Sequence, residues 1–262
     1  MNHLFSTTDP TYNYYESELQ ARTPKEKVFV IFNYLLPGIL ITLLINVKSV
    51  VNYLSQLFDT SIEQYQYYIV VFVALGWHLC YPLYVLKVKR KYTWKAIAQT
   101  LSLHRFSVKG FFLLTPLFFI LVLVIAVPYM RYVFPVLNQF LQQIPLLQIP
   151  EHSIFHDYET LYEFSPWQIA LLLIGNFLGE EVYFRGYLMK RSAFLGKHNW
   201  WIHSLLFTIY HLWQIPMTYA LGFISLAFGL YMSWRKNLYE LILLHILINL
   251  LLPTVVQLVF YS

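Results

Sequence analysis

The sequence is poor in charged residues and in cysteine. Only 12% of its 262 residues are charged, whereas 58% are hydrophobic; a soluble domain usually has about 25% charged residues. Because Cys80 is the single cysteine, an intrachain disulfide and a cysteine-based metal cluster are excluded. The composition therefore favours a membrane protein over a soluble one.

Long apolar stretches recur along the chain, and a membrane-spanning helix needs about 20 mostly apolar residues. Candidate spans are 28–46, 67–86, 111–130, 166–186, 199–214, 217–234 and 238–260. The sequence thus predicts an all-α, polytopic transmembrane helix bundle of about seven spans. The fifth stretch is short, so a bent or re-entrant helix, and with it an even number of spans, stays an alternative.

Basic residues are distributed asymmetrically between the connections. Cytoplasmic loops collect Lys and Arg, and the segments before the first span and after spans two, four and six hold nearly all of them. The opposite loops contain only Lys48 and Arg131 and instead carry Asp59, Glu63, Glu151, Asp157, Glu159 and Glu163. This alternation predicts the N-terminus inside and the C-terminus outside. It also explains the net charge of +5 without a nucleic-acid partner.

Three parts of the chain follow from these patterns. Residues 1–27 are polar, show no cleavable signal peptide and form the predicted cytoplasmic N-terminal segment. Residues 28–164 hold the N-terminal spans with their loops, and 165–262 hold the later spans. The basic loop 87–110 predicts a short interfacial helix around Trp94 and Ile97, which serves either as a membrane-surface connector or as a platform for lipid or substrate.

Ionisable side chains within the spans gather in the last part of the chain. Such groups cost several kcal/mol at membrane depth unless they are paired or face water, so they are candidates for function. The fourth span ends with Asn176, Glu180, Glu181 and Arg185, the fifth carries His211, and the seventh carries His245 and Asn249. The buried His78 and His203 are expected to be interhelical hydrogen-bonding residues, and Glu240 is expected to pair with Arg235 or Lys236.

Helical geometry separates the two adjacent glutamates. Neighbouring side chains project about 100° apart, whereas residues four apart lie on one face. Glu181 is therefore expected to pair with Arg185, which leaves Glu180 on the face shared with Asn176. A desolvated carboxylate without a full cationic partner suits a general base.

The histidines and the last asparagine supply the other parts of a hydrolytic site. His245 and Asn249 are four residues apart and offer two hydrogen-bond donors, which can hold a developing oxyanion. His211 can assist the base, hold the attacking water or act as a ligand. By rise along the helix, Glu180 and His245 lie nearer the cytoplasmic face than His211, a mismatch that a tilted or broken fifth span would remove.

Other hydrolytic schemes lack their parts in this sequence. It has no HExxH motif and no GxSxG elbow, and none of the predicted spans contains Asp for an aspartyl dyad. Ser204 and Ser225 have no nucleophile motif around them. A carboxylate and histidine site remains.

Together, these segments resemble the CPBP intramembrane proteases, which include CAAX prenyl endopeptidases and bacterial relatives linked to bacteriocin processing or self-immunity. The family pattern is EExxxR, FxxxH and HxxxN. The sequence has all three, as EEVYFR at Glu180–Arg185, FTIYH at Phe207–His211 and HILIN at His245–Asn249. The resemblance covers roughly 165–252, so 165–262 is interpreted as a protease core.

The resemblance implies roles for these residues. Glu180 would activate water with His211, His245 and Asn249 would stabilise the oxyanion, and Glu181 and Arg185 would support them. The family's label as metalloproteases implies an alternative in which zinc is bound by Glu180, His211 and His245; two His and one carboxylate would suit a catalytic zinc site. We favour the mechanism without a metal.

The predicted function is therefore an intramembrane endopeptidase that cleaves a membrane-associated or lipidated peptide or protein. A bacterial plasma membrane is the expected location. Two alternatives use the same spans: a non-proteolytic immunity or regulatory protein that binds a peptide or a sensor kinase, and a proton-coupled transporter, because Glu and His within spans also form relays. No inverted repeat supports the transporter.

Overall fold

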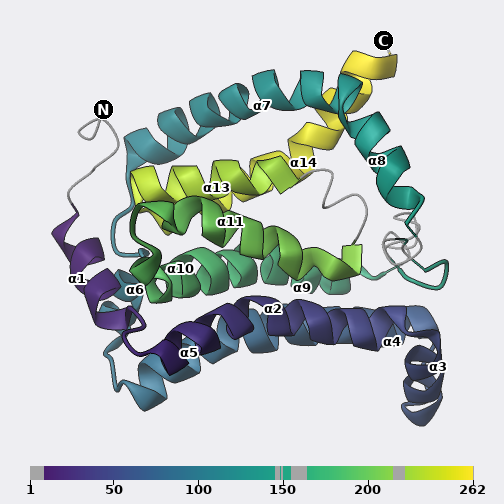
Figure 1. Cartoon of the computed structure of the whole chain (residues 1–262), viewed down its shortest axis with the longest axis horizontal. Coiled ribbons are helices and arrows are strands. Elements are labelled where there is room, and N and C mark those ends of the chain that lie inside the picture. The colour runs from purple at the N-terminus through teal and green to yellow at the C-terminus, as the bar shows by residue number, and fades with distance from the viewer. Residues whose placement is uncertain (1–8, 145–147, 149, 155–163, 215–221, 262) are drawn as a thin grey trace.

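The computed structural model describes residues 9–144, 148, 150–154, 164–214 and 222–261. Of these described residues 85% are helical, and no strand occurs among them. The predicted all-α class is confirmed. In Figure 1 the long helices run along the long axis of the molecule, with α7 along the top, α2, α4 and α5 along the bottom, and the C-terminal helices between them.

Within the described ranges, three helices are long and apolar enough to cross a membrane: α2 (Pro24–Asn46), the continuous helix Ile62–Lys89 and the continuous helix Gly110–Tyr132. At about 1.5 Å per residue, 23 residues extend roughly 35 Å, which exceeds the roughly 30 Å hydrocarbon core. They coincide with the first three predicted spans. The second comprises α4 (Ile62–Val71), π-helical η1 (Phe72–Cys80), α5 (Tyr81–Tyr84) and π-helical η2 (Val85–Lys89). The third comprises π-helical η3 (Gly110–Leu114) and α7 (Thr115–Tyr132).

The apolar surface of α7 fits a lipid environment. A row of its aliphatic side chains is at least half exposed, which would be unfavourable in water: Leu117, Ile120, Leu121, Val124 and Ile125. Its buried side chains, including Phe119 and Val122, face the bundle instead. Together with the three long apolar helices, this surface identifies an integral membrane protein.

The other four predicted spans correspond to four helices in the second half of the chain. One is a continuous helix over 166–191, formed by α9 (Pro166–Ile174), π-helical η6 (Gly175–Gly179), π-helical η7 (Glu181–Leu188) and α10 (Met189–Arg191). The others are α11 (Asn199–Tyr210), α13 (Gly222–Arg235) and α14 (Leu238–Tyr261). The 12 residues of α11 extend only about 18 Å. Seven spans and the orientation of the termini therefore stay predictions.

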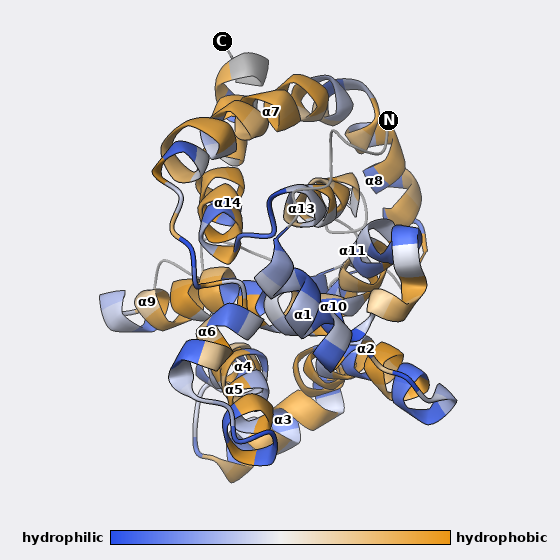
Figure 2. Ribbon diagram, turned by 90° about the vertical axis from the view of Figure 1, so that its left-hand side faces the viewer, coloured by the Kyte–Doolittle hydropathy of each residue, from blue (hydrophilic) through white to orange (hydrophobic). Residues whose placement is uncertain are grey.

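The connections predicted to lie in the cytoplasm meet at one end of the bundle, at the left of Figure 1. The backbone N–H of Ala21 donates to Arg191 O at 3.0 Å, and Asn237 Nδ2 donates to Arg105 O at 2.8 Å. This basic end holds α1 (Pro10–Leu19) and α6 (Trp94–Thr100), and Figure 2 shows the hydrophilic residues of both as the viewer faces it. The short helix predicted in the loop 87–110 is α6.

At the opposite end of the bundle, the Gln66 side chain joins two segments by hydrogen bonds to their backbone carbonyls. Gln66 Nε2 donates to Ile45 O and to His152 O, each at 3.0 Å. Two short helices lie at this end, α3 (Lys48–Leu57) and α8 (Phe134–Gln142). Residues 217–221 of the sixth predicted span and the acidic Asp157, Glu159 and Glu163 lie outside the described residues.

Two glycines let the helices approach closely where the polar residues gather. A Cβ atom at Gly38 in α2 would overlap the carbonyl oxygen of Tyr210, the last residue of α11. A Cβ at Gly179 would overlap the carbonyl of Ala74 in η1. Because only glycine lacks this atom, α2 packs against the end of α11 and η1 packs against η6.

Candidate active site

Glu180 and Glu181 lie at the junction of η6 and η7, in the middle of the helix over 166–191. Both are buried, with 5% and 0% of their surface exposed. π-helical turns within helices often occur at functional sites, and no sequence pattern predicted these two. The two carboxylates contact different partners, as the separation of adjacent helical side chains predicts.

Glu180 faces His211. Its Oε1 lies 3.9 Å from His211 Nε2, too long for a direct hydrogen bond but short enough for one water to contact both groups. His211 begins the 3₁₀ turn η9 (His211–Gln214). The turn thus brings His211 to Glu180 from the end of a short helix, which agrees with the expected break in the fifth predicted span.

The orientation of the His211 ring follows from its second nitrogen. His211 Nδ1 lies 2.9 Å from the carbonyl oxygen of Phe207, which can only accept, so Nδ1 carries a proton. In the neutral imidazole, Nε2 therefore presents a lone pair to Glu180. The ring stacks on Trp213, with 5.7 Å between the ring centres, and makes a T-shaped contact with Phe207 at 4.6 Å, so aromatic packing restricts its orientation.

Glu181 forms a separate buried cluster with Arg185 and His245. Arg185 Nη1 donates to Glu181 Oε1 at 3.0 Å, and both side chains are fully buried. This is the i, i+4 pair expected from the sequence. His245 Nδ1 from α14 lies 2.9 Å from the same carboxylate oxygen, although the direction of the contact is not that of a hydrogen bond.

Arg185 is also held by aromatic rings. Its guanidinium carbon lies 3.8 Å from the centre of the Phe207 ring and 5.0 Å from that of Phe228. The π-faces favour the cation, but Nε and Nη2 of Arg185 and Oε2 of Glu181 have no hydrogen-bond partner among the described residues. The cluster therefore contains a close, buried ion pair between Glu181 and Arg185, and also buried polar atoms that lack hydrogen bonds to the described residues.

Asn249 lies one helical turn beyond His245 and has a different partner. Its Nδ2 donates to Asn176 Oδ1 at 3.3 Å, and the contact is exposed. Asn176 lies in η6, four residues before Glu180. His245 and Asn249 thus both face the helix over 166–191, as their spacing predicted, but they contact it at separate points.

The residues named for a zinc site do not form one ligand set. His245 contacts Glu181, whereas Glu180 contacts His211. Among the described residues, no group of three or more His, Cys, Asp or Glu side chains is placed to hold a metal ion. In this arrangement the three residues do not converge on one point; zinc binding stays an alternative, and no step below passes through a metal.

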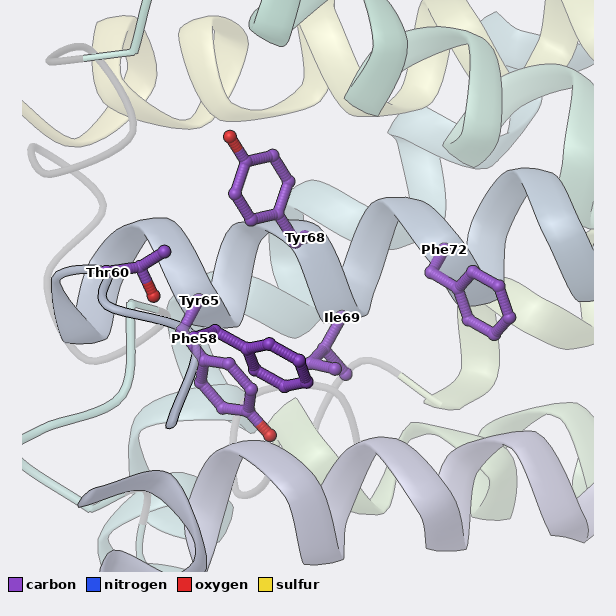
Figure 3. Close-up of a pocket in the computed structure, with 6 residues that line it drawn as sticks. All are labelled: Phe58, Thr60, Tyr65, Tyr68, Ile69 and Phe72. Atoms are coloured by element: carbon purple, nitrogen blue, oxygen red, sulfur yellow. The ribbon is translucent and has the colours of Figure 1, made fainter. Parts of the chain in front are cut away.

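Two pockets lie away from these residues. One, of about 390 Å³, is lined by Phe58, Thr60, Tyr65, Tyr68, Ile69 and Phe72. Figure 3 shows it beside α4. The other, of about 220 Å³, is at the basic end and is lined by Asp9, Ser102, His104, Arg105, Ser107, Arg235, Lys236 and Asn237.

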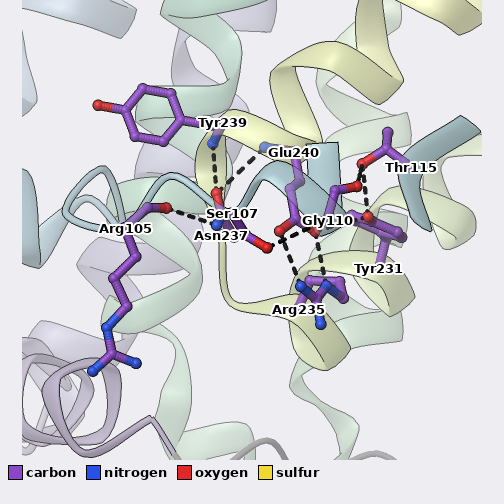
Figure 4. A network of polar contacts seen from close by, with 9 residues as sticks. All are labelled: Arg105, Ser107, Gly110, Thr115, Tyr231, Arg235, Asn237, Tyr239 and Glu240. Atoms are coloured by element: carbon purple, nitrogen blue, oxygen red, sulfur yellow. Dashed lines mark hydrogen bonds and ion pairs between the residues drawn. The ribbon is translucent and has the colours of Figure 1, made fainter. Parts of the chain in front are cut away.

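A polar network adjoins the second pocket. Glu240 accepts hydrogen bonds from Arg235 Nε at 2.8 Å and from the Tyr231 hydroxyl at 2.9 Å (Figure 4). This is the pairing with Arg235 expected from the sequence. A Cβ at Gly110 would overlap the Glu240 carboxylate, so the network also fixes where η3 meets α14.

Comparison with known proteins identifies the region that carries the site. No curated protein and no solved structure matches the chain. Residues 162–251 match the family of Rce1-like type II CAAX prenyl endopeptidases, and this range includes Glu180, His211, His245 and Asn249. The predicted CPBP and CAAX protease relationship is confirmed. Over residues 162–251 the chain is therefore similar to the Rce1-like type II CAAX prenyl endopeptidase family.

Proposed function

We propose that this protein is an intramembrane endopeptidase in which Glu180, with His211, activates water to cleave a membrane-associated or lipidated peptide. The observation that carries the proposal is the buried pair of Glu180 Oε1 and His211 Nε2, 3.9 Å apart. Both groups can accept a proton, and one water can contact both. The family match favours proteolysis over a non-proteolytic immunity or regulatory role.

The proposed reaction is a hydrolysis with two proton transfers. The water oxygen forms a bond to the peptide carbonyl carbon as one water proton passes to the Glu180 carboxylate, with His211 Nε2 accepting a hydrogen bond from the water. The C–N bond then breaks, and the proton on Glu180 passes to the leaving amine. The products are a carboxylic acid, which keeps the second water proton, and an amine, so Glu180 returns to its starting state.

His245 and Asn249 are proposed to stabilise the tetrahedral oxyanion. His245 Nδ1 lies 2.9 Å from Glu181 Oε1, and the other ring nitrogen, Nε2, is proposed to donate to the oxyanion. The nearby guanidinium of Arg185 adds a positive charge on this side of the site, which favours the oxyanion.

Asn249 donates to Asn176, so substrate has to replace this partner. The contact is exposed and 3.3 Å long, which makes the exchange inexpensive. Once substrate has replaced this contact, Asn176 Oδ1 is available to accept a hydrogen bond from a peptide N–H. The pair is therefore proposed as the part of the site that changes partners when substrate binds.

The test is hydrolysis of farnesylated and unmodified peptides by the purified protein in lipid nanodiscs. Glu180→Gln and His211→Ala are expected to lower kcat by at least about 100-fold. Glu63→Gln is the matched control, because Glu63 is an exposed residue in the first turn of α4. Wild-type turnover in both site variants would refute the proposal.

A further inference from the structure

The pocket of about 220 Å³ at the basic end of the bundle takes no part in the proposed reaction. Two segments meet there: the loop before η3, with Arg105 and Ser107, and the turn between α13 and α14, with Arg235, Lys236 and Asn237. Asn237 Nδ2 donates to Arg105 O at 2.8 Å and joins the two segments (Figure 4). Sites for drug-sized ligands begin at roughly 300 Å³, so this smaller pocket suits a compact polar group.

The basic side chains of this pocket have donors that their protein partners do not use. The Arg105 side chain is 63% exposed, and its Nη1 lies 3.6 Å from Asp9 Oδ2, which is longer than a hydrogen bond. Lys236 Nζ, which has three donors, makes an exposed hydrogen bond of 3.0 Å with one of them. Arg235 donates to Glu240 from Nε and Nη2, so this pair does not use Nη1. An anion with several oxygens can therefore bind without breaking these contacts.

The carboxylate that lines the pocket already has partners. Asp9 Oδ1 caps α1 by accepting hydrogen bonds from two backbone N–H groups at the start of this helix, at 2.9 and 3.1 Å. The helix N-terminus stabilises its negative charge. Glu240 and Glu16 lie near these cations, but neither lines the pocket. Among the lining residues, three Lys and Arg side chains outnumber the one carboxylate, and this balance attracts an anion.

Exposed apolar side chains adjoin the pocket. Phe106 and Val108 alternate along the loop with Arg105 and Ser107, and are 54% and 65% exposed. Phe112 is 68% exposed, and its ring centre lies 6.5 Å from that of Phe106. Such side chains are unfavourable in water but suit the membrane interface, where headgroups meet acyl chains. A free phosphate ion would contact only the polar part of this surface, whereas a phospholipid would contact both parts.

We infer that the pocket binds the phosphate group of an anionic phospholipid. Arg105 and Lys236 donate hydrogen bonds to the phosphate oxygens. The acyl chains lie against the apolar side chains of the loop and of η3. The place agrees with the predicted orientation, because the pocket is at the basic end and the cytoplasmic leaflet of a membrane carries anionic lipids. The inference concerns binding alone and does not depend on the proposed peptidase activity.

The test is equilibrium binding of radiolabelled dioleoylphosphatidylglycerol to the purified protein in neutral detergent micelles. Unlabelled dioleoylphosphatidylcholine, which has the same acyl chains and a phosphate but no net charge, is one competitor. Inorganic phosphate, which has no acyl chain, is the other. The pocket variants are Arg105→Gln and Lys236→Gln, and Val108→Ser alters the apolar part. Lys95→Gln is the matched control, because Lys95 is an exposed residue of α6 at the same end that does not line the pocket.

The wild-type protein is expected to bind a single phosphatidylglycerol, at least about 10-fold more tightly than phosphatidylcholine. Arg105→Gln and Lys236→Gln should each weaken binding by about 10-fold, the effect of losing one charge-assisted hydrogen bond. Lys95→Gln should change it by less than about 2-fold. Val108→Ser should weaken binding of the lipid, and inorganic phosphate should compete poorly. The Tm of each variant without lipid shows that it is folded, and the two pocket variants test the site separately.

Three results would overturn the inference. Equal affinity for the two lipids would mean that the pocket does not select an anion. Equal losses in Lys95→Gln and in the pocket variants would assign binding to the general charge of the basic end. Displacement of the lipid by millimolar inorganic phosphate, with Val108→Ser unchanged, would identify free phosphate as the ligand in place of a lipid.

Discussion

His245 Nδ1 lies 2.9 Å from Glu181 Oε1, whereas the neighbouring Glu180 faces His211 at 3.9 Å. Two glutamates adjacent in the sequence thus contact two different histidines, which belong to different helical segments. The first contact belongs to a fully buried ion cluster with Arg185; the second leaves room for a water. The two glutamates should therefore respond differently to the same substitution.

Glu181→Gln is expected to destabilise the protein by about 3–5 kcal/mol, because it leaves the buried Arg185 without its counter-ion. Glu180→Gln should leave the unfolding temperature close to that of wild type while abolishing turnover. Thermal unfolding of both variants in the same nanodiscs checks the difference. Equal Tm values would mean that the cluster around Arg185 does not contribute to stability.

Arg185→Lys tests the aromatic contacts of the guanidinium. Lysine keeps the positive charge but not the planar group that stacks on Phe207 at 3.8 Å. We expect a loss of roughly 2 kcal/mol, the size of a desolvated cation–π interaction. Denaturation of the variant beside Arg191→Lys measures it, and an unchanged midpoint would refute a stacking contribution.

Lys190 predicts a pH dependence of stability at the basic end. It lies beyond the fourth predicted span, is fully buried, and donates from Nζ to Ser102 Oγ at 2.8 Å. Burial lowers the pKa of Lys190 from 10.5 to about 7, although the nearby carboxylates of Glu16 and Asp9 oppose this shift. The unfolded chain therefore binds more protons between these two values, so stability from this group rises with pH by up to about 1.4 kcal/mol per unit.

Lys190→Met should remove this rise and be more stable than wild type at pH 7 and below. Tm measured from pH 6 to 10 checks both expectations, with the exposed Lys197→Met as control. A wild-type Tm that falls between pH 7 and 9, with Lys190→Met following the same curve, would contradict the assignment.

Gly38→Ala is expected to lower both stability and turnover. The added Cβ overlaps the Tyr210 carbonyl, so α2 must move away from the end of α11, and His211 moves with it; overpacking of this kind costs about 1–3 kcal/mol. Gly76→Ala is the control, because a Cβ there meets only the Phe72 ring at 3.6 Å. Full activity in Gly38→Ala would mean that this contact does not position His211.

Chelation separates the two chemistries proposed for this family. Turnover should persist after dialysis against EDTA and 1,10-phenanthroline, because His245 is paired with Glu181 and not gathered with Glu180 and His211. Metal content by mass spectrometry completes the measurement. Stoichiometric zinc together with loss of activity on chelation would establish the zinc alternative.

Local spacing was enough to predict part of the site. The contact of Glu181 with Arg185 follows from their separation by four residues on one helix. The same rule placed His245 and Asn249 on one face of α14. It could not predict that His245 meets Glu181, because this contact depends on how α14 packs against the helix over 166–191.

Properties that arise from packing were likewise not visible in the sequence. Hydrophobic length predicted α2 and the next two long helices well, since their apolar runs are uninterrupted. It could not show that α11 ends at Tyr210 or that η7 is π-helical, because both depend on neighbouring helices. His78 was expected to be a satisfied interhelical residue, and its nitrogens have no such partner among the described side chains.

The close approach of α2 to the end of α11 at Gly38 has a consequence for protein engineering. Residues 162–251 match the family, but the contacts that place His211, and the whole aromatic surround of His78, join this region to helices from the first half of the chain. A fragment limited to residues 162–251 would contain all three motifs. It would lack α2 and η1, the helices against which these motifs pack. Transplanting the proposed activity is therefore expected to require the first two long helices as well.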